Sequence, residues 1–312
     1  MKILVLGGSG MLGSALSDVL FVERHNVIWV GSGIADLTNE NETNKLFNEV
    51  KPDIVYHCAA MVGGIGDNNK KNYQYMLKNA QMTINAINAA EKMNIEKFFY
   101  ISSSCAYPRD CPQPMISDDF LTGPFEPTNE GYAMSKMIGI LLCKFQNVEY
   151  KRNYKSYNLC NLYGPKDNFT ESGHVMSSLI RKFATAAHHN HPSVTLWGDG
   201  SAKREFLHVH DAANAIYHLT LGDYSDIIDY NVNVGSGFEI SIRDLAEMIA
   251  ESTKYCGEII WDTTKPSGMP RKLMDDHVLS TANWKPLISL KEGVDAMIEY
   301  YKEKYFVTFK YH

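Results

Sequence analysis

A tyrosine and a lysine lie four residues apart in the segment GYAMSK, residues 131–136. On a helix the two side chains share a face, so the Lys136 ammonium is expected to hold the Tyr132 phenol and to favour its deprotonated form. An earlier serine run supplies a hydroxyl, from Ser103 or Ser104, for the same substrate oxygen. Because a free tyrosine has a pKa of about 10, it needs such neighbours to act as a general acid or base on a ketone or alcohol.

The amino terminus has the pattern of a dinucleotide-binding site. An apolar run at residues 3–6 is followed by Gly7, Gly10 and Gly13, and then by apolar residues at helical spacing. Glycines allow a tight turn and a close approach to a pyrophosphate, and the helix amino terminus presents free N–H groups to that anion. The order of strand, glycine loop and helix supports this interpretation of the motif.

Apolar runs continue to alternate with helical stretches along the first half of the chain, at residues 27–30, 54–58, 98–101 and 157–162. This alternation predicts an α/β fold with a doubly wound parallel sheet. The glycine loop, the serine run and the Tyr132 helix would then follow the carboxyl ends of strands, where ligands bind in such sheets.

The alternation fades after about residue 165, which predicts a smaller α/β substrate lobe. The segment KPSGMPRK, residues 265–272, is assigned to this lobe. A helix at 208–219 and a strand at 230–235 are expected to return to the first lobe. The predicted division is a dinucleotide-binding domain of 1–165 with 207–235, and a substrate lobe of 166–206 with 236–312.

Composition excludes several classes of function. The net charge of −6 argues against nucleic-acid binding, which needs a basic face. No apolar run approaches the roughly 20 residues of a membrane span, and the first apolar stretch is too short for a signal peptide. We therefore expect a soluble cytoplasmic protein without a nucleic-acid or membrane partner.

The six cysteines show no CxxC or Cys/His ligand spacing, so the sequence indicates neither a disulfide framework nor a zinc site. A cluster of His188, His189 and His191 lacks acidic or cysteine partners. A solvated loop is the favoured interpretation of this cluster, and no metal is predicted.

Several longer motifs resemble one family along nearly the whole chain. They are GGSGMLGSAL, ISSSCAYP, EPTNEGYAMSK, NLYGPKDNF, LWGDGSAKREFLHV and KPSGMPRKLMD. Together they resemble the GDP-L-fucose synthase family of extended short-chain dehydrogenase/reductases, which have a Rossmann fold. The glycine triplet and YxxxK are shared by the whole superfamily, whereas the third and fifth motifs are specific to this branch.

The resemblance implies an enzyme that epimerises C3 and C5 of GDP-4-keto-6-deoxy-D-mannose and then reduces the C4 ketone with NADPH. It implies that Ser103 orients the substrate, that Tyr132 donates a proton to the C4 oxygen, and that Lys136 tunes Tyr132 and holds the nicotinamide ribose. It further makes Cys105 the epimerisation base and His174 the epimerisation acid.

This assignment is chemically reasonable. A 4-keto group acidifies the protons on C3 and C5, and the reference pKa values of cysteine and histidine, about 8.5 and 6.5, bracket neutral pH. Taken alone, Cys105 would be a packing thiol and His174 a loop histidine. Related dehydratases carry an acidic pair where this chain has Cys105 and Ala106, which argues against dehydration.

The resemblance also implies two sets of binding residues. The expected NADPH contacts, besides Tyr132 and Lys136, are Gly7, Gly10, Met11, Leu12, Gly13, Asp36, Leu37, Ala59 and Ala60. The expected contacts to the GDP-sugar are Asn161, Lys182, Trp197, Arg204 and Lys272. Lys182 replaces an arginine that is common in relatives, and a solvated helix face is the alternative interpretation.

Two departures leave alternatives open. Ser9 and residues 30–33 stand where NADPH-selective relatives usually have arginine, so NADH remains the alternative cofactor. Leu159 and Cys160 replace residues near the expected sugar, so a reductase of a GDP-4-keto-heptose, acting at C4 only, remains an alternative function. A non-catalytic dinucleotide-sensing protein is a third possibility, but such proteins typically lose the tyrosine or lysine.

Helices near residues 75–93 and 131–148 carry apolar faces beyond what the sheet requires. By the same resemblance they would pair across a homodimer as a four-helix bundle, and ordinary core packing is the alternative interpretation.

Overall fold

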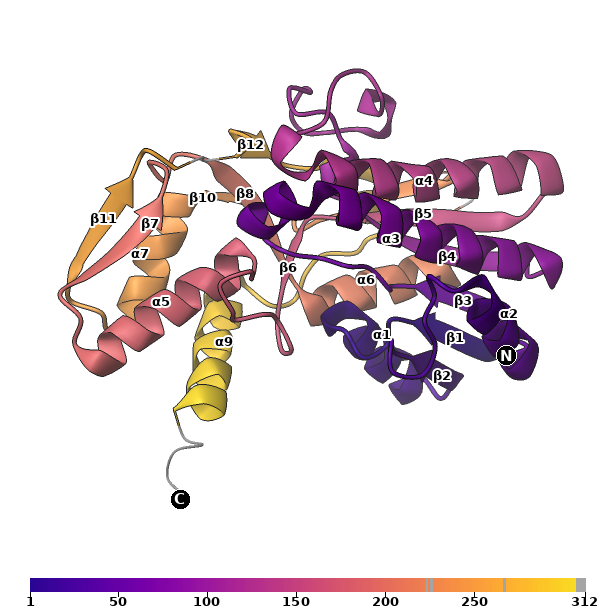
Figure 1. The fold of residues 1–312 in the computed structure, drawn as a ribbon, viewed down its shortest axis with the longest axis horizontal. Coiled ribbons are helices and arrows are strands. Elements are labelled where there is room, and N and C mark those ends of the chain that lie inside the picture. Colours follow the sequence, from indigo (N-terminus) through magenta and orange to yellow (C-terminus); the bar gives the residue numbers. More distant parts are fainter. Residues whose placement is uncertain (223, 225–226, 266–267, 307–312) are drawn as a thin grey trace.

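The computed structural model describes residues 1–222, 224, 227–265 and 268–306. Two lobes lie side by side along the longest axis of the molecule (Figure 1). Part of the predicted 265–272 segment and the last six residues of the predicted substrate lobe lie outside the described residues.

The first lobe is built on a six-stranded sheet with the order β2-β1-β3-β4-β5-β9, in which every neighbouring pair is parallel. The strand order reverses at β1, so the loop that follows β1 opens at the switch point where such sheets bind ligands. The doubly wound parallel sheet predicted from the sequence is therefore confirmed. Its strands are β1 (Lys2–Leu6), β2 (Asn26–Val30), β3 (Ile54–His57), β4 (Lys97–Ser103), β5 (Asn153–Leu159) and β9 (Asn231–Val234).

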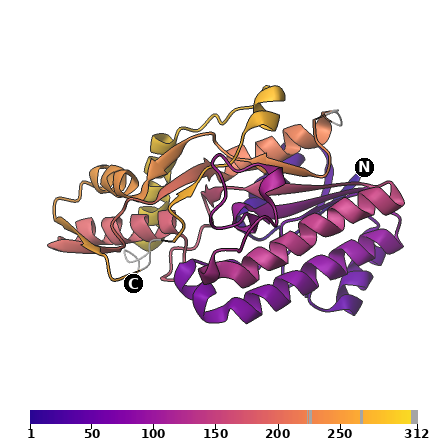
Figure 2. The ribbon, with the colours of Figure 1, turned by 90° about the horizontal axis from the view of Figure 1, so that it is seen from above.

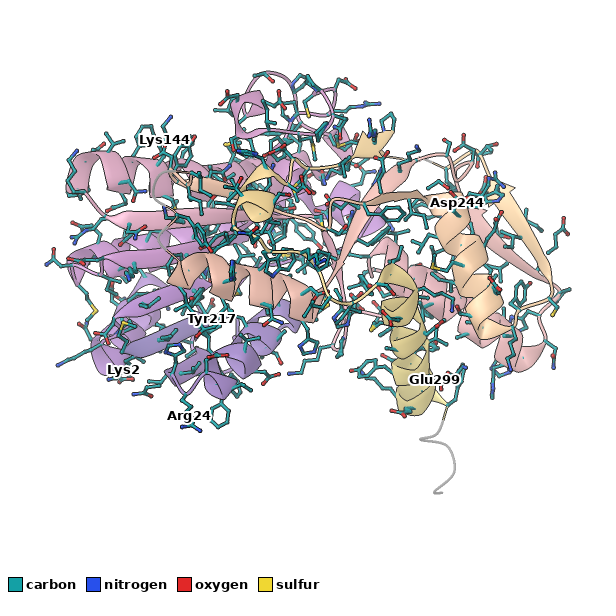
Figure 3. All side chains as sticks on the ribbon, turned by 180° about the vertical axis from the view of Figure 1, so that it is seen from behind. Lys2, Arg24, Lys144, Tyr217, Asp244 and Glu299 are labelled. Atoms are coloured by element: carbon teal, nitrogen blue, oxygen red, sulfur yellow. The ribbon has the colours of Figure 1, made fainter. Side chains whose placement is uncertain are left out.

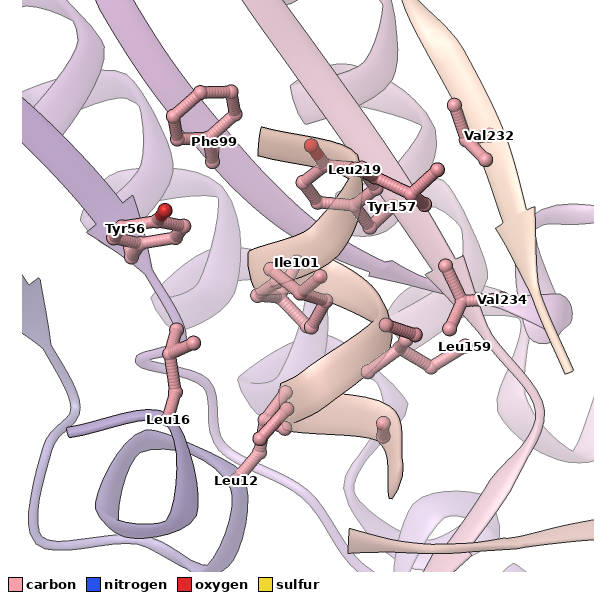
Figure 4. Close-up of a cluster of buried hydrophobic side chains, with 14 of the residues drawn as sticks. Leu12, Leu16, Tyr56, Phe99, Ile101, Tyr157, Leu159, Leu219, Val232 and Val234 are labelled. Atoms are coloured by element: carbon pink, nitrogen blue, oxygen red, sulfur yellow. The ribbon is translucent and has the colours of Figure 1, made fainter. Parts of the chain in front are cut away.

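Helices cover both faces of this sheet because successive side chains of each strand point to opposite sides. On one face, Leu12, Leu16 and Leu219 pack against aromatic strand residues such as Tyr56 and Tyr157 (Figure 4). The helices on that face are α1 (Met11–Val22) and α6 (Val209–Leu221), and those on the other are α2 (Glu40–Val50), α3 (Ile65–Lys92) and α4 (Glu130–Tyr150).

The predicted strand at 157–162 is wrong in its bounds. The strand β5 ends at Leu159, and a separate strand, β6 (Asn161–Tyr163), pairs with β8 (Lys203–His208) of the other lobe. Both stretches are apolar, so the pattern of hydrophobic residues carries no sign that the chain changes sheets at this point.

The second lobe contains a sheet of order β10-β8-β12, with β6 added on β8, and a separate parallel pair of β7 and β11. Lys144 on α4 and Asp244 on α7 mark the two lobes, and Glu299 lies on the last helix (Figure 3). The remaining elements are α5 (Val175–His189), β7 (Ser193–Trp197), β10 (Glu239–Ser241), α7 (Ile242–Thr253), β11 (Glu258–Asp262), β12 (Arg271–Lys272), α8 (His277–Thr281) and α9 (Leu290–Tyr305).

The β8 strand crosses the predicted domain boundary at residues 206–207 and continues directly into α6 of the first lobe. Apolar residues of α5, α7 and α9 form the separate core of the second lobe, including Phe183, Ile249 and Met297. Each lobe therefore has a core of its own, and β6 and β8 connect them.

Three short 3-10 helices border the carboxyl edge of the first sheet, at Ser104–Ala106, Ser117–Asp119 and Pro127–Asn129. The segment between the first two 3-10 helices is held by Asn233 of β9. Tyr107 donates to Asn233 Oδ1 over 2.7 Å, and Asn233 Nδ2 donates to the Met115 carbonyl over 2.9 Å. These bonds hold the segment against the sheet.

Within the described part of the chain, no helix combines the length and apolar character needed to cross a membrane. No group of three or more His, Cys, Asp and Glu side chains among those residues is arranged to hold a metal ion. The six cysteines are all free.

The contact between α4 and β4 gives a test of the packing that supports Tyr132. A Cβ on Gly139 of α4 would overlap the ring of Tyr100 on β4. We expect Gly139→Ala to lower the free energy of unfolding by roughly 1–3 kcal/mol, because overpacking outweighs the gain in helix propensity. Denaturant unfolding measures this, with Gly123→Ala in an exposed loop as the control; equal stability of the two variants would contradict the packing argument.

Candidate active site

Tyr132 and Lys136 lie in the first two turns of α4, as the YxxxK spacing predicts. Lys136 is only 4% exposed, and its Nζ donates to the Ile101 carbonyl of β4 over 2.7 Å. The same Nζ lies 5.7 Å from the centroid of the Tyr132 ring. Burial lowers the pKa of Lys136 to about 8.

The predicted effect of Lys136 on Tyr132 is corrected by the structure. Burial raises the pKa of Tyr132 well above its usual value, and the nearby Cys105 sulfur acts in the same direction, while a hydrogen bond with Ser103 opposes them. The Lys136 ammonium donates to the Ile101 carbonyl and does not reverse this upward shift of the Tyr132 pKa. The phenol is therefore protonated near neutral pH, which is the state a proton donor needs.

Ser103 and Cys105 lie next to Tyr132, at the carboxyl end of β4. The Ser103 hydroxyl accepts a hydrogen bond of 3.1 Å from the Cys105 backbone N–H. The Cys105 sulfur accepts hydrogen bonds from Asn129 Nδ2 and from Lys272 Nζ, both at 3.2 Å. Three segments far apart in the sequence therefore meet at one thiol.

The pKa of the Cys105 thiol is below its usual value. Burial on its own would raise it, but the Lys272 charge and hydrogen bonds from Ser103, Lys272 and Asn129 outweigh burial. These neighbours increase the thiolate fraction of Cys105 relative to an ordinary cysteine.

His174 lies on the opposite lobe, where it is the N-cap residue of α5. Its loop is tied to the first lobe, because the Gly64 N–H donates to the Ser172 carbonyl over 2.8 Å. No hydrogen bond or ring contact joins His174 to Tyr132, Cys105 or Lys136 among the described residues. The structure thus brings four of the five predicted catalytic residues together and places the fifth, His174, on the other lobe.

The glycine loop fits a dinucleotide pyrophosphate. Gly7 has φ +80°, and a Cβ there would lie 2.5 Å from the Ala59 backbone nitrogen. A Cβ on Gly13 would overlap the Gly7 carbonyl oxygen. Gly10 is the exposed N-cap of α1 and caps it without a side-chain hydrogen bond, so the N–H groups of the first turn face the loop.

The other predicted cofactor residues differ in their exposure. Leu12 is buried in the core, so only its backbone N–H can serve a ligand, and Met11 is partly exposed. Asp36 is exposed and accepts from Thr38, which lowers its pKa, while Leu37 beside it is buried. Ala59 and Ala60 are partly exposed after β3.

The residues predicted to bind the substrate differ in what their side chains contact. Arg204 of β8 stands directly opposite Lys272 of β12, and Trp197 is 50% exposed. Asn161 Nδ2 instead donates to the Glu205 carbonyl over 2.9 Å, and Lys182 Nζ donates to the Thr195 carbonyl over 2.7 Å. Lys272, expected at the diphosphate, has its ammonium on Cys105.

Residues not singled out from the sequence also belong to this site. Asn129 lies inside the EPTNE motif, three positions before Tyr132, but only its contact with Cys105 reveals a role. Tyr75 of α3 packs edge-on against Tyr132, with ring centroids 6.4 Å apart. Neither residue carried a spacing signal that links it to the chemistry.

Residues 3–235 match the NAD dependent epimerase/dehydratase family. GDP-L-fucose synthase 1 of Arabidopsis thaliana is 39% identical over 302 residues, which cover 96% of this chain and 93% of that protein. The chain belongs to the GDP-L-fucose synthase family.

Solved structures agree with this family assignment. A GDP-6-OMe-4-keto-L-xylo-heptose reductase from C. jejuni superposes with a TM-score of 0.90 at 28% identity, covering 97% of this chain and 98% of the reductase. A GDP-L-fucose synthetase from Naegleria fowleri bound to NADP gives a TM-score of 0.87 at 25% identity, covering 97% and 94%. The fold is therefore that of the extended short-chain dehydrogenase/reductases.

The glycine loop gives a test of the cofactor site. We expect Gly13→Ala to weaken NADPH binding by about tenfold or more, since the new methyl displaces the Gly7 carbonyl and opens the loop. Titration calorimetry with NADPH measures the dissociation constant. Gly123→Ala, in an exposed loop where a Cβ meets only Pro108 at 3.4 Å, is the control. Unchanged affinity of Gly13→Ala would show that this loop does not hold the cofactor.

Proposed function

We propose that the protein uses NADPH to reduce the C4 ketone of a GDP-4-keto-6-deoxy-hexose after inverting C3 and C5. The observation that carries this proposal is the cluster of Ser103, Cys105, Tyr132 and Lys136 at the carboxyl end of β4. It combines a protonated phenol for reduction with an activated thiol for proton abstraction. Family membership and the GDP-sugar chemistry named for its relatives supply the substrate class.

In the epimerisation, the Cys105 thiolate takes a proton from C3 or C5, and the electron pair of the broken C–H bond moves toward the C4 oxygen. The His174 imidazolium returns a proton to the same carbon from the other face. The 4-keto group makes both steps accessible, because it stabilises the negative charge between them.

In the reduction, Tyr132 donates its phenolic proton to the C4 oxygen, while the Ser103 hydroxyl orients that oxygen. Bound NADPH supplies the hydride. Lys136, fixed to the Ile101 carbonyl, lies beside the phenol and holds the cofactor ribose. The uncapped amino terminus of α1 and the glycine loop bind the pyrophosphate.

The two lobes divide the binding work in this proposal. Residues 1–165 with 207–235 hold the dinucleotide, and residues 166–206 with 236–312 hold the GDP-sugar. The proposed contacts to the nucleotide are Trp197, which is half exposed, and Arg204. Arg204 Nη1 donates to the Lys203 carbonyl over 2.7 Å, and its guanidinium has further N–H donors for a diphosphate. The six free cysteines fit a reducing compartment, so we propose the cytoplasm as the location.

Mutations can separate the two proposed reactions, which are proton exchange at C3 and C5 and reduction of the C4 ketone. We expect Tyr132→Phe to lower reduction by about 10²–10⁴-fold and to lower hydrogen–deuterium exchange at C3 and C5 much less. The phenol gives its proton to the product alcohol but only a hydrogen bond to the enolate oxygen. Cys105→Ser should abolish exchange and spare reduction of an already epimerised 4-keto sugar. NMR of deuterium incorporation without NADPH, and absorbance of NADPH, measure the two reactions.

Each variant has its own folding control, because Tyr132→Phe keeps the exchange reaction and Cys105→Ser keeps the reduction. Full reduction by Tyr132→Phe would refute the proposed mechanism. Absence of exchange in the native protein, with reduction of a GDP-4-keto-heptose intact, would show a C4 reductase instead.

We also propose a homodimer formed by α3 and α4, which pack side by side along one flank of the first lobe (Figure 2). Tyr73, Leu77 and Ile84 of α3 are exposed at helical spacing, as are Phe145 and Val148 of α4. Such an apolar stripe on both helices suits a second copy of the same surface.

We expect Leu77→Asp to shift the protein from dimer to monomer, because it buries a charge at the centre of this stripe. Sedimentation velocity measures the change. Leu287→Asp is the matched control, since Leu287 is 81% exposed and lies on the other lobe; a dimer that survives Leu77→Asp would rule out this interface.

A further inference from the structure

Lys272 is buried against the active-site thiol. Its residue is 8% exposed, and within the described chain the Cys105 sulfur, 3.2 Å away, is the one hydrogen-bond acceptor of its ammonium. A buried ammonium is costly unless a negative or strongly polar group compensates it. A neutral thiol compensates poorly, whereas a thiolate does so well.

The backbone around Lys272 is held in place on both sides. The strand β12 pairs with β8, which sets Lys272 opposite Arg204. Immediately afterwards, Met115 donates to the Leu273 carbonyl over 2.8 Å and accepts from Asp275 over 3.0 Å. These backbone hydrogen bonds therefore fix the position from which the Lys272 ammonium reaches the Cys105 sulfur.

Asn129, Arg204 and Lys136 also stabilise negative charge on the sulfur. Asn129 donates a second hydrogen bond to it, and Arg204 of β8 is close enough for its charge to interact with Cys105. From α4, Lys136 adds a further positive charge and Tyr132 remains a neutral phenol. The nearby carboxylate of Glu126 acts on Arg204.

We propose that Lys272, together with Asn129, keeps Cys105 as a thiolate, and that Lys272 is a positioning residue for proton abstraction at C3 and C5. This inference rests on the proposed function. The thiolate electron pair forms the new S–H bond, the C–H pair moves to the C4 oxygen, and Lys272 keeps its protons throughout. The loss of the sulfur charge then leaves Lys272 uncompensated, which favours release of the captured proton.

The test is the pH dependence of Cys105 alkylation by iodoacetamide, without substrate, followed by mass spectrometry of the Cys105 peptide. In the native protein we expect the midpoint to lie below the value of about 8.5 for free cysteine. Lys272→Met should raise the midpoint by at least about one unit, which slows alkylation near neutral pH about tenfold, because only the thiolate reacts. Asn129→Ala should raise it less.

Two controls separate this effect from loss of structure. Lys272→Arg keeps the positive charge and should retain most of the native midpoint, and exposed Cys256 should react identically in every variant. The C3 and C5 exchange rate should fall in Lys272→Met with little change in KM.

If Lys272→Met leaves the pH midpoint of Cys105 alkylation unchanged and raises KM for the GDP-sugar, the inference is overturned. Lys272 would then be a contact to the diphosphate, as the sequence predicts. Alkylation needs no turnover, so this result is independent of the proposed function. A native protein that shows the low midpoint but no carbon exchange would disprove the epimerisation and leave the thiolate assignment standing.

Discussion

The burial of one ammonium group organises this site. Lys136 lies inside the protein with its Nζ on the Ile101 carbonyl, so α4 cannot move along β4 without leaving a charge unsolvated. That bond sets the first turns of α4, which carry Tyr132, beside Ser103 at the end of β4 and Cys105 in the 3-10 helix that follows. The absence of a side chain on Gly139 allows the same helix to approach Tyr100 closely.

Electrostatics then couples the two halves of the proposed chemistry. Cys105 lies among the charges of Lys136, Lys272 and Arg204. Burial raises the pKa of Tyr132, and a negative charge on Cys105 raises it further. The thiolate that we propose and a protonated phenol therefore support each other. Proton abstraction from carbon needs the first state, and reduction needs the second. One arrangement of charges therefore prepares both the base and the acid.

Prediction from the sequence succeeded where local pattern decides the structure. Strand, glycine loop and helix at the amino terminus, and the YxxxK helix, follow from spacing within a short stretch of chain. It was wrong where the outcome depends on distant segments. The apolar residues 157–162 divide between two sheets, and the pKa of Tyr132 rises with burial, which no spacing reports.

The sequence by itself determined the parallel α/β fold, the family and the types of reactive side chain, because hydrophobic period and motif order are properties of neighbouring residues. Only the tertiary structure decided which groups share an environment. It brought Lys272 and Asn129 to Cys105, and it directed Lys182 and Asn161 to backbone carbonyls. The physical reason is that desolvation and charge interaction depend on distances between atoms, which strand pairing sets across more than a hundred residues of chain.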